Sequence, residues 1–151
     1  MTALQTHPVH QRMNAGRLAP SVYRAMAAFD RSIELDPVLR ELIKIRASQL
    51  NGCAYCLDMH TRDARAAGED ERRLATLAGW REAPFFTERE RAALALTDAV
   101  TRLGEHGVTD DVWADAAAQF DDAELAQVLW AVVAINAWNR IGVATHLQPE
   151  S

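Results

Sequence analysis

The sequence lacks the long apolar and basic stretches that mark several large classes of protein. No segment approaches the roughly 20 consecutive apolar residues of a membrane-spanning helix, and residues 1–17 hold no apolar run typical of a secretory signal. Arginine and lysine do not gather into a stripe and the formal net charge is −5, which argues against a nucleic-acid interface. These absences predict a cytoplasmic protein that binds neither nucleic acid nor membrane.

Cysteine is scarce: the chain holds two, Cys53 and Cys56. In a reducing compartment two cysteines are not expected to form a permanent structural disulfide. Both cysteines fall within four positions of each other, and this spacing matters more than their number.

Patterns of alternating polar and apolar residues, which would indicate strands, are also absent. From Pro20 onward the apolar residues recur every three to four positions, the period of an α-helix. A chain of 151 residues fits one compact domain. We therefore predict an N-terminal arm over residues 1–18 and a single all-α domain over residues 19–151, a bundle of about six to seven helices.

Start and stop signals place these helices. Proline after Asp36 suits a first helical position, Gly52 and Gly68 suit helix ends, and capping patterns begin at Thr87 and Asp121. The predicted helices cover about 20–34, 37–51, 53–68, 70–78, 87–104, a stretch beginning at 109, and 121–145.

The last predicted helix is apolar around nearly its whole circumference, which requires burial on all sides. Its apolar residues include Leu125, Val128, Trp130, Val133, Ile135 and Trp138. In so small a domain, part of that burial is expected from a second subunit. Asn136, Asn139 and Arg140 interrupt the apolar pattern and need polar partners, for which we expect a network between subunits.

Cys53, Cys56 and His60 share one helix face, because residues three and four apart are neighbours on a helix surface. Glu41 lies on the preceding helix, which the tight Asn51-Gly52 turn would fold back toward this face. Reduction of a peroxide by thiols needs a thiolate nucleophile, a proton for the leaving oxygen and a second thiol. A helix N-terminus and an imidazole both favour the thiolate, so the four residues supply every part.

Other interpretations of these residues remain. Cys-x-x-Cys with a histidine also suggests zinc, although structural zinc normally takes a second ligand pair, which the chain lacks. A c-type haem attachment needs histidine where Leu57 stands. Two free cysteines at helical spacing can also be ordinary core residues. We predict no metal and no organic cofactor.

The pattern Glu-x11-Cys-x-x-Cys-x3-His, formed by Glu41, Cys53, Cys56 and His60, resembles the AhpD-type alkylhydroperoxidase core of the carboxymuconolactone decarboxylase-like superfamily. The close resemblance runs from about residue 41 to residue 68. It implies an AhpD-like helical fold that assembles as trimers or hexamers. It further implies that Cys56 attacks the peroxide, that Cys53 resolves it as a disulfide, and that His60 and Glu41 relay protons.

Two features weigh on this resemblance. The helix dipole alone would favour the thiolate of Cys53, at the N-terminal end, whereas His60 lies one turn from Cys56 and favours that thiol. The best-known active members of the family also carry a histidine between the cysteines, where this chain has Tyr55. A phenol cannot replace imidazole as a base near pH 7, so Tyr55 bears on rate and on the preferred peroxide.

The sequence therefore predicts a peroxiredoxin-type enzyme for antioxidant defence that reduces alkyl hydroperoxides. It would be recycled by an external dithiol donor, for which the family resemblance suggests a lipoyl-bearing protein. The alternatives are a stand-alone thiol-disulfide oxidoreductase or redox sensor and, further off, a lactone decarboxylase or a non-catalytic helical oligomer.

Overall fold

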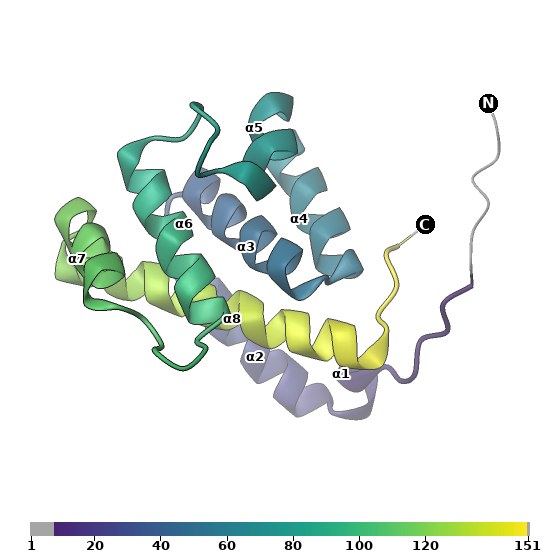
Figure 1. Ribbon diagram of the computed structural model, residues 1–151. Helices are drawn as coiled ribbons and strands as arrows, with labels where there is room; N and C mark the ends of the chain where they lie inside the picture. Colours follow the sequence, from purple (N-terminus) through teal and green to yellow (C-terminus); the bar gives the residue numbers. More distant parts are fainter. Residues whose placement is uncertain (1–7, 151) are drawn as a thin grey trace, which may run out of the picture.

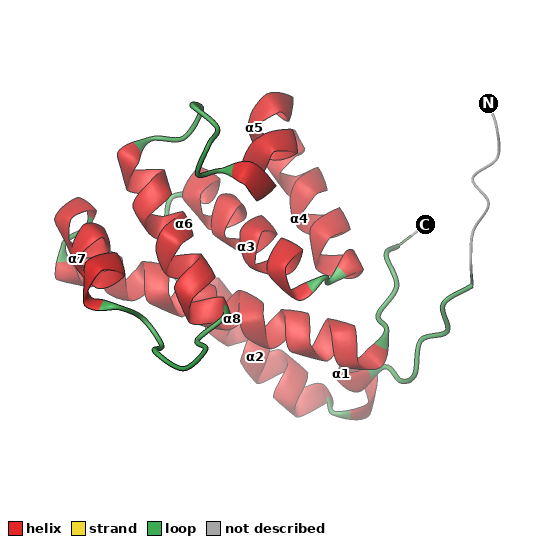
Figure 2. Cartoon of the chain, viewed as in Figure 1, coloured by secondary structure: helices red, strands yellow, loops and turns green. Residues whose placement is uncertain are grey.

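The structure, a computed structural model, describes residues 8–150 and consists of helices joined by short connections, with no strand in that range (Figure 2). The helices are α1 (Ala15–Leu18), α2 (Pro20–Ser32), α3 (Pro37–Asn51), α4 (Ala54–Ala66), α5 (Glu71–Thr76), α6 (Glu88–Thr101), α7 (Asp110–Gln119) and α8 (Asp122–Thr145), with a 3₁₀ turn at Leu77–Gly79. The all-α, single-domain prediction is confirmed.

Side-chain caps begin the helices where the sequence placed them. The Asp36 carboxylate accepts from the N–H of Leu39 at the start of α3. Thr87 and Asp121 each open a capping box, closed by Glu90 and Glu124, at the start of α6 and α8. The structure adds α1, a single turn within the stretch predicted as an arm, which begins where the Asn14 side chain accepts from the N–H of Arg17.

Helix α8 runs through the molecule as its central element, with α3, α4 and α6 on one side and α2 along another (Figure 1). Its buried side chains contribute Val128, Val132 and Ile135 to the main core, which also contains both cysteines. A second, smaller core beneath α5 and the 3₁₀ turn includes Leu77 and Trp80. The cysteines therefore lie in the main core, where α4 meets α8.

Helix α8 is long and apolar enough to span a membrane by length and composition alone, yet half of the tested stretch is buried inside the structure. Burial of this kind is typical of the core helix of a helical domain. The opposite side of α8 is uncovered in the single chain: Trp130, Val133 and Ile141 are exposed there. The sequence expectation that α8 is apolar all round is thus met, and its exposed side is only partly covered, by the contact of Trp130 with Phe29 of α2.

The turn between α3 and α4 places the cysteines. Gly52 ends α3 in the left-handed conformation (φ 67°), which glycine adopts without a steric penalty. The backbone N–H groups of Gly52 and Cys53 both return to the carbonyl oxygen of Ser48. The chain reverses in this turn, so that α4 packs against α3 and Glu41 on α3 comes to face His60 on α4.

Candidate active site

The two cysteines form a close pair at the start of α4. Cys53 is the N-cap residue and Cys56 lies in the first turn, and their Sγ atoms are 2.9 Å apart. Both are free thiols and both are buried. A disulfide bond of about 2 Å would require the sulfurs to approach by only about 1 Å, so the pair can open and close with little rearrangement of the helix.

His60 lies one turn beyond Cys56 on the same buried face of α4, followed by Ala64 after another turn. Its Nδ1 atom is 2.9 Å from Oε2 of Glu41, and both side chains are largely buried. A carboxylate at Nδ1 holds the ring in one orientation and leaves Nε2 as the nitrogen free to exchange a proton. The structure therefore joins the four predicted site residues in two pairs, Cys53 with Cys56 and Glu41 with His60, and places His60 one turn from Cys56 on the buried face of α4.

The pKa values of the two thiols are shifted in opposite directions, that of Cys53 downward and that of Cys56 upward. The Cys56 thiol, hydrogen-bonded to Cys53, lowers the pKa of Cys53 to about 6 against the effect of burial, with help from the backbone N–H of Cys56 and the Asn139 amide. The same shared proton, together with burial, raises the pKa of Cys56. In the resting pair the negative charge thus lies on Cys53, the thiol that the helix N-terminus favours.

Tyr55, between the cysteines, packs against the main core. Its side chain is half-buried there, and burial raises the pKa of its phenol. The phenol therefore stays protonated and neutral near neutral pH. His60 is the imidazole available to the sulfur pair.

A buried polar network joins α3 and α6 to α8. The Asn51 amide donates to Oδ1 of Asn136 (2.9 Å) and to Oδ1 of Asn139 (3.0 Å), while Asn139 donates to Ser48 (2.9 Å) and Asn136 to Thr101 (3.0 Å). The sequence predicts partners for these asparagines in another subunit, whereas the structure provides partners within the chain. Arg140 also donates to Asn136.

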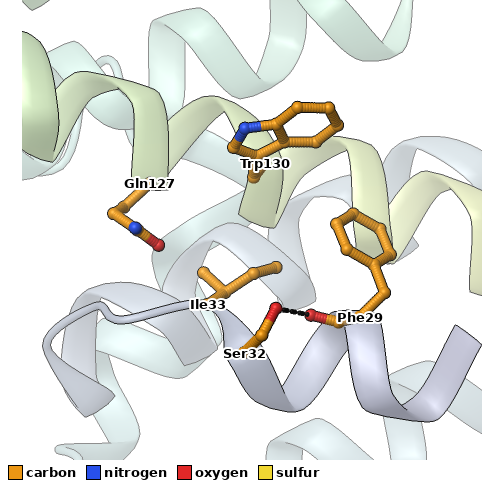
Figure 3. A pocket seen from close by; sticks show the side chains of 5 residues that line it. All are labelled: Phe29, Ser32, Ile33, Gln127 and Trp130. Atoms are coloured by element: carbon orange, nitrogen blue, oxygen red, sulfur yellow. Dashed lines mark hydrogen bonds between the residues drawn. The ribbon is translucent and has the colours of Figure 1, made fainter.

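Glu41 connects the buried site with the surface. It helps to line a small hollow of about 110 Å³ between α3, α4 and α5, whose wall also includes Val38, Ala64 and Arg73. The carboxylate therefore contacts His60 on one side and a space open to water on the other. A larger hollow of about 500 Å³ lies between α2 and α8, lined by Phe29, Ser32, Ile33, Gln127 and Trp130, and does not involve the cysteines (Figure 3).

One set of side chains in the described range has the spacing of metal ligands. Ligand atoms of Glu41, His60 and Asp63 all lie within 4.8 Å of one another, and Asp63 is exposed. A nitrogen and two carboxylates suit a divalent cation such as zinc. The two cysteines, which the sequence raised as zinc ligands, are not part of this set.

Comparison with known proteins places the chain in a family. The sequence model of the Carboxymuconolactone decarboxylase family matches residues 20–99. The uncharacterised protein YdfG of Bacillus subtilis is 36% identical over 137 residues, which cover 89% of this chain and 93% of YdfG.

Solved structures share the fold. A protein of unknown function from Agrobacterium tumefaciens, described as a candidate antioxidant defence protein AhpD, is 39% identical with a TM-score of 0.90, over 94% of this chain and 99% of that one. An uncharacterised peroxidase-related protein from Silicibacter is 23% identical with a TM-score of 0.77, over 87% and 72% of the two chains. The chain belongs to the carboxymuconolactone decarboxylase family and has the AhpD-like fold that its Cys-x-x-Cys motif predicted.

Proposed function

We propose that this protein is a thiol peroxidase that reduces alkyl hydroperoxides in antioxidant defence. The observation that carries the proposal is the sulfur pair, with Sγ atoms 2.9 Å apart, beside a histidine whose Nδ1 is held by Glu41. The proposal is also supported by the names of the structural relatives, one a candidate antioxidant defence protein and one peroxidase-related. Its alternatives are a thiol-disulfide oxidoreductase or redox sensor that uses the same pair, and a lactone decarboxylase.

In the first step a thiolate of the pair attacks the outer oxygen of the hydroperoxide. The O–O bond breaks, the sulfur becomes a sulfenic acid and the leaving alkoxide takes up a proton as an alcohol. We assign the attack to Cys56, because His60 lies one turn away and can exchange the required proton. The short S–S separation lets the charge of the resting pair pass from Cys53 to Cys56 by movement of the shared proton.

In the second step the thiol of Cys53 attacks the sulfenic acid, forming the Cys53–Cys56 disulfide and releasing water. An external dithiol then reduces the disulfide and is itself oxidised, which restores both thiols. A lipoyl-bearing protein fits this role by its chemistry. No metal or organic cofactor takes part in these steps.

His60 and Glu41 are proposed to carry the protons. Glu41 fixes the ring through Nδ1 and stabilises the imidazolium that forms when Nε2 takes a proton. The hollow beside Glu41 then offers exchange with bulk water. By this route His60, a buried base, can exchange protons with solvent through Glu41.

We further propose that the protein is cytoplasmic and assembles with copies of itself, as a trimer or hexamer. The support is the uncovered apolar side of α8, which continues onto α2 around the larger hollow (Figure 3). The Phe29 and Trp130 rings stack edge to face across that boundary, 5.7 Å apart, so the two helices present one surface.

The proposed activity is tested by stopped-flow oxidation of the reduced protein with an organic hydroperoxide. The wild type should lose both thiols far faster than free cysteine, and a sulfenic acid should be trapped in Cys53→Ser but not in Cys56→Ser. Trapping only in Cys56→Ser would reverse the two roles. Oxidation no faster than free cysteine would reject the peroxidase, and rapid exchange with a model disulfide would then favour the oxidoreductase.

A further inference from the structure

Asn139 is a polar side chain that the proposed reaction leaves unused, although it is completely buried (0% exposed) on α8. A buried amide in an apolar helix is costly unless its hydrogen-bonding groups are satisfied. Its position is close to the chemistry, because Gly142, one turn further along α8, leaves room for Cys53. A Cβ atom at residue 142 would lie 2.7 Å from Sγ of Cys53.

The neighbours of Asn139 fix the orientation of its amide. Asn51 donates to Oδ1 of Asn139 at 3.0 Å, which identifies that atom as the oxygen. Nδ2 of Asn139 donates to Oγ of Ser48 at 2.9 Å. The Ser48 hydroxyl itself donates to the carbonyl oxygen of Lys44 at 2.7 Å, so it can only accept from Asn139. The amide is therefore held with Nδ2 as donor and cannot turn over without losing both bonds.

One hydrogen of Nδ2 remains after the bond to Ser48, because a primary amide carries two. Cys53 lies close to Asn139, because its N–H donates to the carbonyl oxygen of Ser48, whose hydroxyl receives Nδ2, and its Sγ lies against Gly142. The amide also lowers the pKa of both Cys53 and Cys56. A neutral donor near the sulfur pair has the polarity that stabilises a thiolate.

We propose that the side-chain amide of Asn139 donates its second hydrogen to the Cys53–Cys56 sulfur pair and so holds the thiolate on which the reaction depends. This inference adds a residue to the proposed peroxidase site, and the catalytic role of Asn139 rests on the proposed function. Three groups around the pair are charged or titratable besides the cysteines themselves: His60 and Tyr55 on α4, and Lys44 on α3, which is paired with Asp30 of α2. From α8 the pair receives a neutral donor.

The test measures the apparent pKa of the reduced pair from the pH dependence of alkylation by iodoacetamide, which needs no peroxide. In Asn139→Ala, which removes the donor and adds no charge, the pKa should rise by about one unit. The rate of alkylation at pH 5 should fall roughly tenfold, because it follows the thiolate fraction. Asn139→Asp keeps the shape and the bond from Asn51 but replaces Nδ2 by oxygen, and should raise the pKa further.

Asn136→Ala is the matched control. Asn136 is also buried on α8 and also receives a bond from Asn51, but it donates to Thr101 and to the carbonyl oxygen of Val132. A purely structural role of the network predicts equal shifts in the two alanine variants. Our proposal predicts a thiol pKa in Asn136→Ala close to that of the wild type.

An unchanged pKa in Asn139→Ala, or an equal rise in Asn136→Ala, would overturn the inference. If Asn139→Ala does not fold, Asn139→Asp gives the same comparison. The two proposals fail separately: a raised thiol pKa in Asn139→Ala, combined with wild-type peroxide oxidation no faster than free cysteine, would keep the amide donor and remove the peroxidase.

Discussion

At the scale of single residues, the cysteine pair behaves as one titrating unit. Its first proton leaves with a pKa of about 6, against 9.0 for a free thiol, while the second is held well above the usual range. The charge rests on Cys53, whereas the attacking role of Cys56 stays a prediction founded on His60. The order of deprotonation and the identity of the attacking sulfur are therefore separate questions, and sulfenic acid trapping addresses the second.

The low first pKa makes the stability of the reduced protein depend on pH. The lowered pKa of Cys53, about 6 in the fold against a value near 9 in the unfolded chain, stabilises the fold increasingly as the pH rises from 6 toward 9, and this contribution is lost as the pH falls through 6. Above pH 9 the raised pKa of Cys56 acts in the opposite direction. We expect the free energy of unfolding to rise on the order of 1–2 kcal/mol between pH 6 and pH 8. Urea unfolding under a reducing agent measures it, and in Cys53→Ser the increase should largely vanish.

The His60–Glu41 pair should control the rate of thiol oxidation. His60→Ala removes the base and should slow oxidation by an organic hydroperoxide by about a hundredfold, and Glu41→Gln, which keeps the hydrogen bond to Nδ1, by about tenfold. Asp63→Asn is the control, since Asp63 is exposed and lies outside the proposed relay. Equal rates in His60→Ala and in the wild type would remove the relay from the mechanism.

The same three residues give a test of metal dependence. If Glu41, His60 and Asp63 do not bind a required metal ion, dialysis against a chelator should leave the oxidation rate unchanged. The Asp63→Asn substitution should also leave that rate unchanged. Loss of activity on chelation, restored by added zinc, would instead mean that the cluster binds a required cation. Metal analysis of the purified protein accompanies the rate measurement.

At the scale of helices, the close approach of α8 to α4 depends on Gly142. Alanine there gains up to about 1 kcal/mol of helix propensity, but its Cβ would lie 2.7 Å from Sγ of Cys53, which is buried. Overpacking of this kind costs about 1–3 kcal/mol, so Gly142→Ala should lower the melting temperature and slow thiol oxidation. Gly79→Ala is the control, because nothing lies within 4 Å of the added Cβ; its melting temperature should match the wild type.

Local chemistry explains which helices the sequence could predict. The boundaries of α3, α6 and α8 follow from Asp36, Thr87 and Asp121, whose caps act within three residues. Helix α1 has only four residues, too few to show the three-to-four-residue apolar period by which a helix is recognised in a sequence. The face shared by Cys53, Cys56 and His60 was likewise predictable from spacing alone.

The polar network around the sulfurs was not predictable in the same way. Asn139 signals a need for partners, but Ser48 and Asn51 lie 91 and 88 residues away along the chain. Only the packing of α3 against α8 brings them together. Spacing within one helix predicts which side chains share a face, whereas the partners across a helix pair require the fold.

At the scale of the whole molecule, the uncovered side of α8 predicts self-association. Trp130 is 53% exposed, and Val133 and Ile141 lie beside it on the same helix. Exposed apolar side chains gathered on one face of a helix are typical of an interface, and a stable interface buries about 800 Å² on each partner. We expect light scattering coupled to size exclusion to give a mass of three or six chains at micromolar concentration.

A single charge should dissolve that assembly if α8 forms its centre. Trp130→Glu places a carboxylate in the apolar surface, where burial without a partner is costly, so the variant should elute as a smaller species with an unchanged helical spectrum. Trp113→Glu makes the same exchange at an exposed tryptophan on α7 and should keep the wild-type mass. A wild-type monomer would remove the oligomer proposal, and dissociation by Trp113→Glu alone would move the interface to α7. Because the cysteines lie on the opposite, buried side of α8, thiol alkylation by iodoacetamide should remain measurable in a monomeric Trp130→Glu, which separates assembly from the chemistry of the sulfur pair.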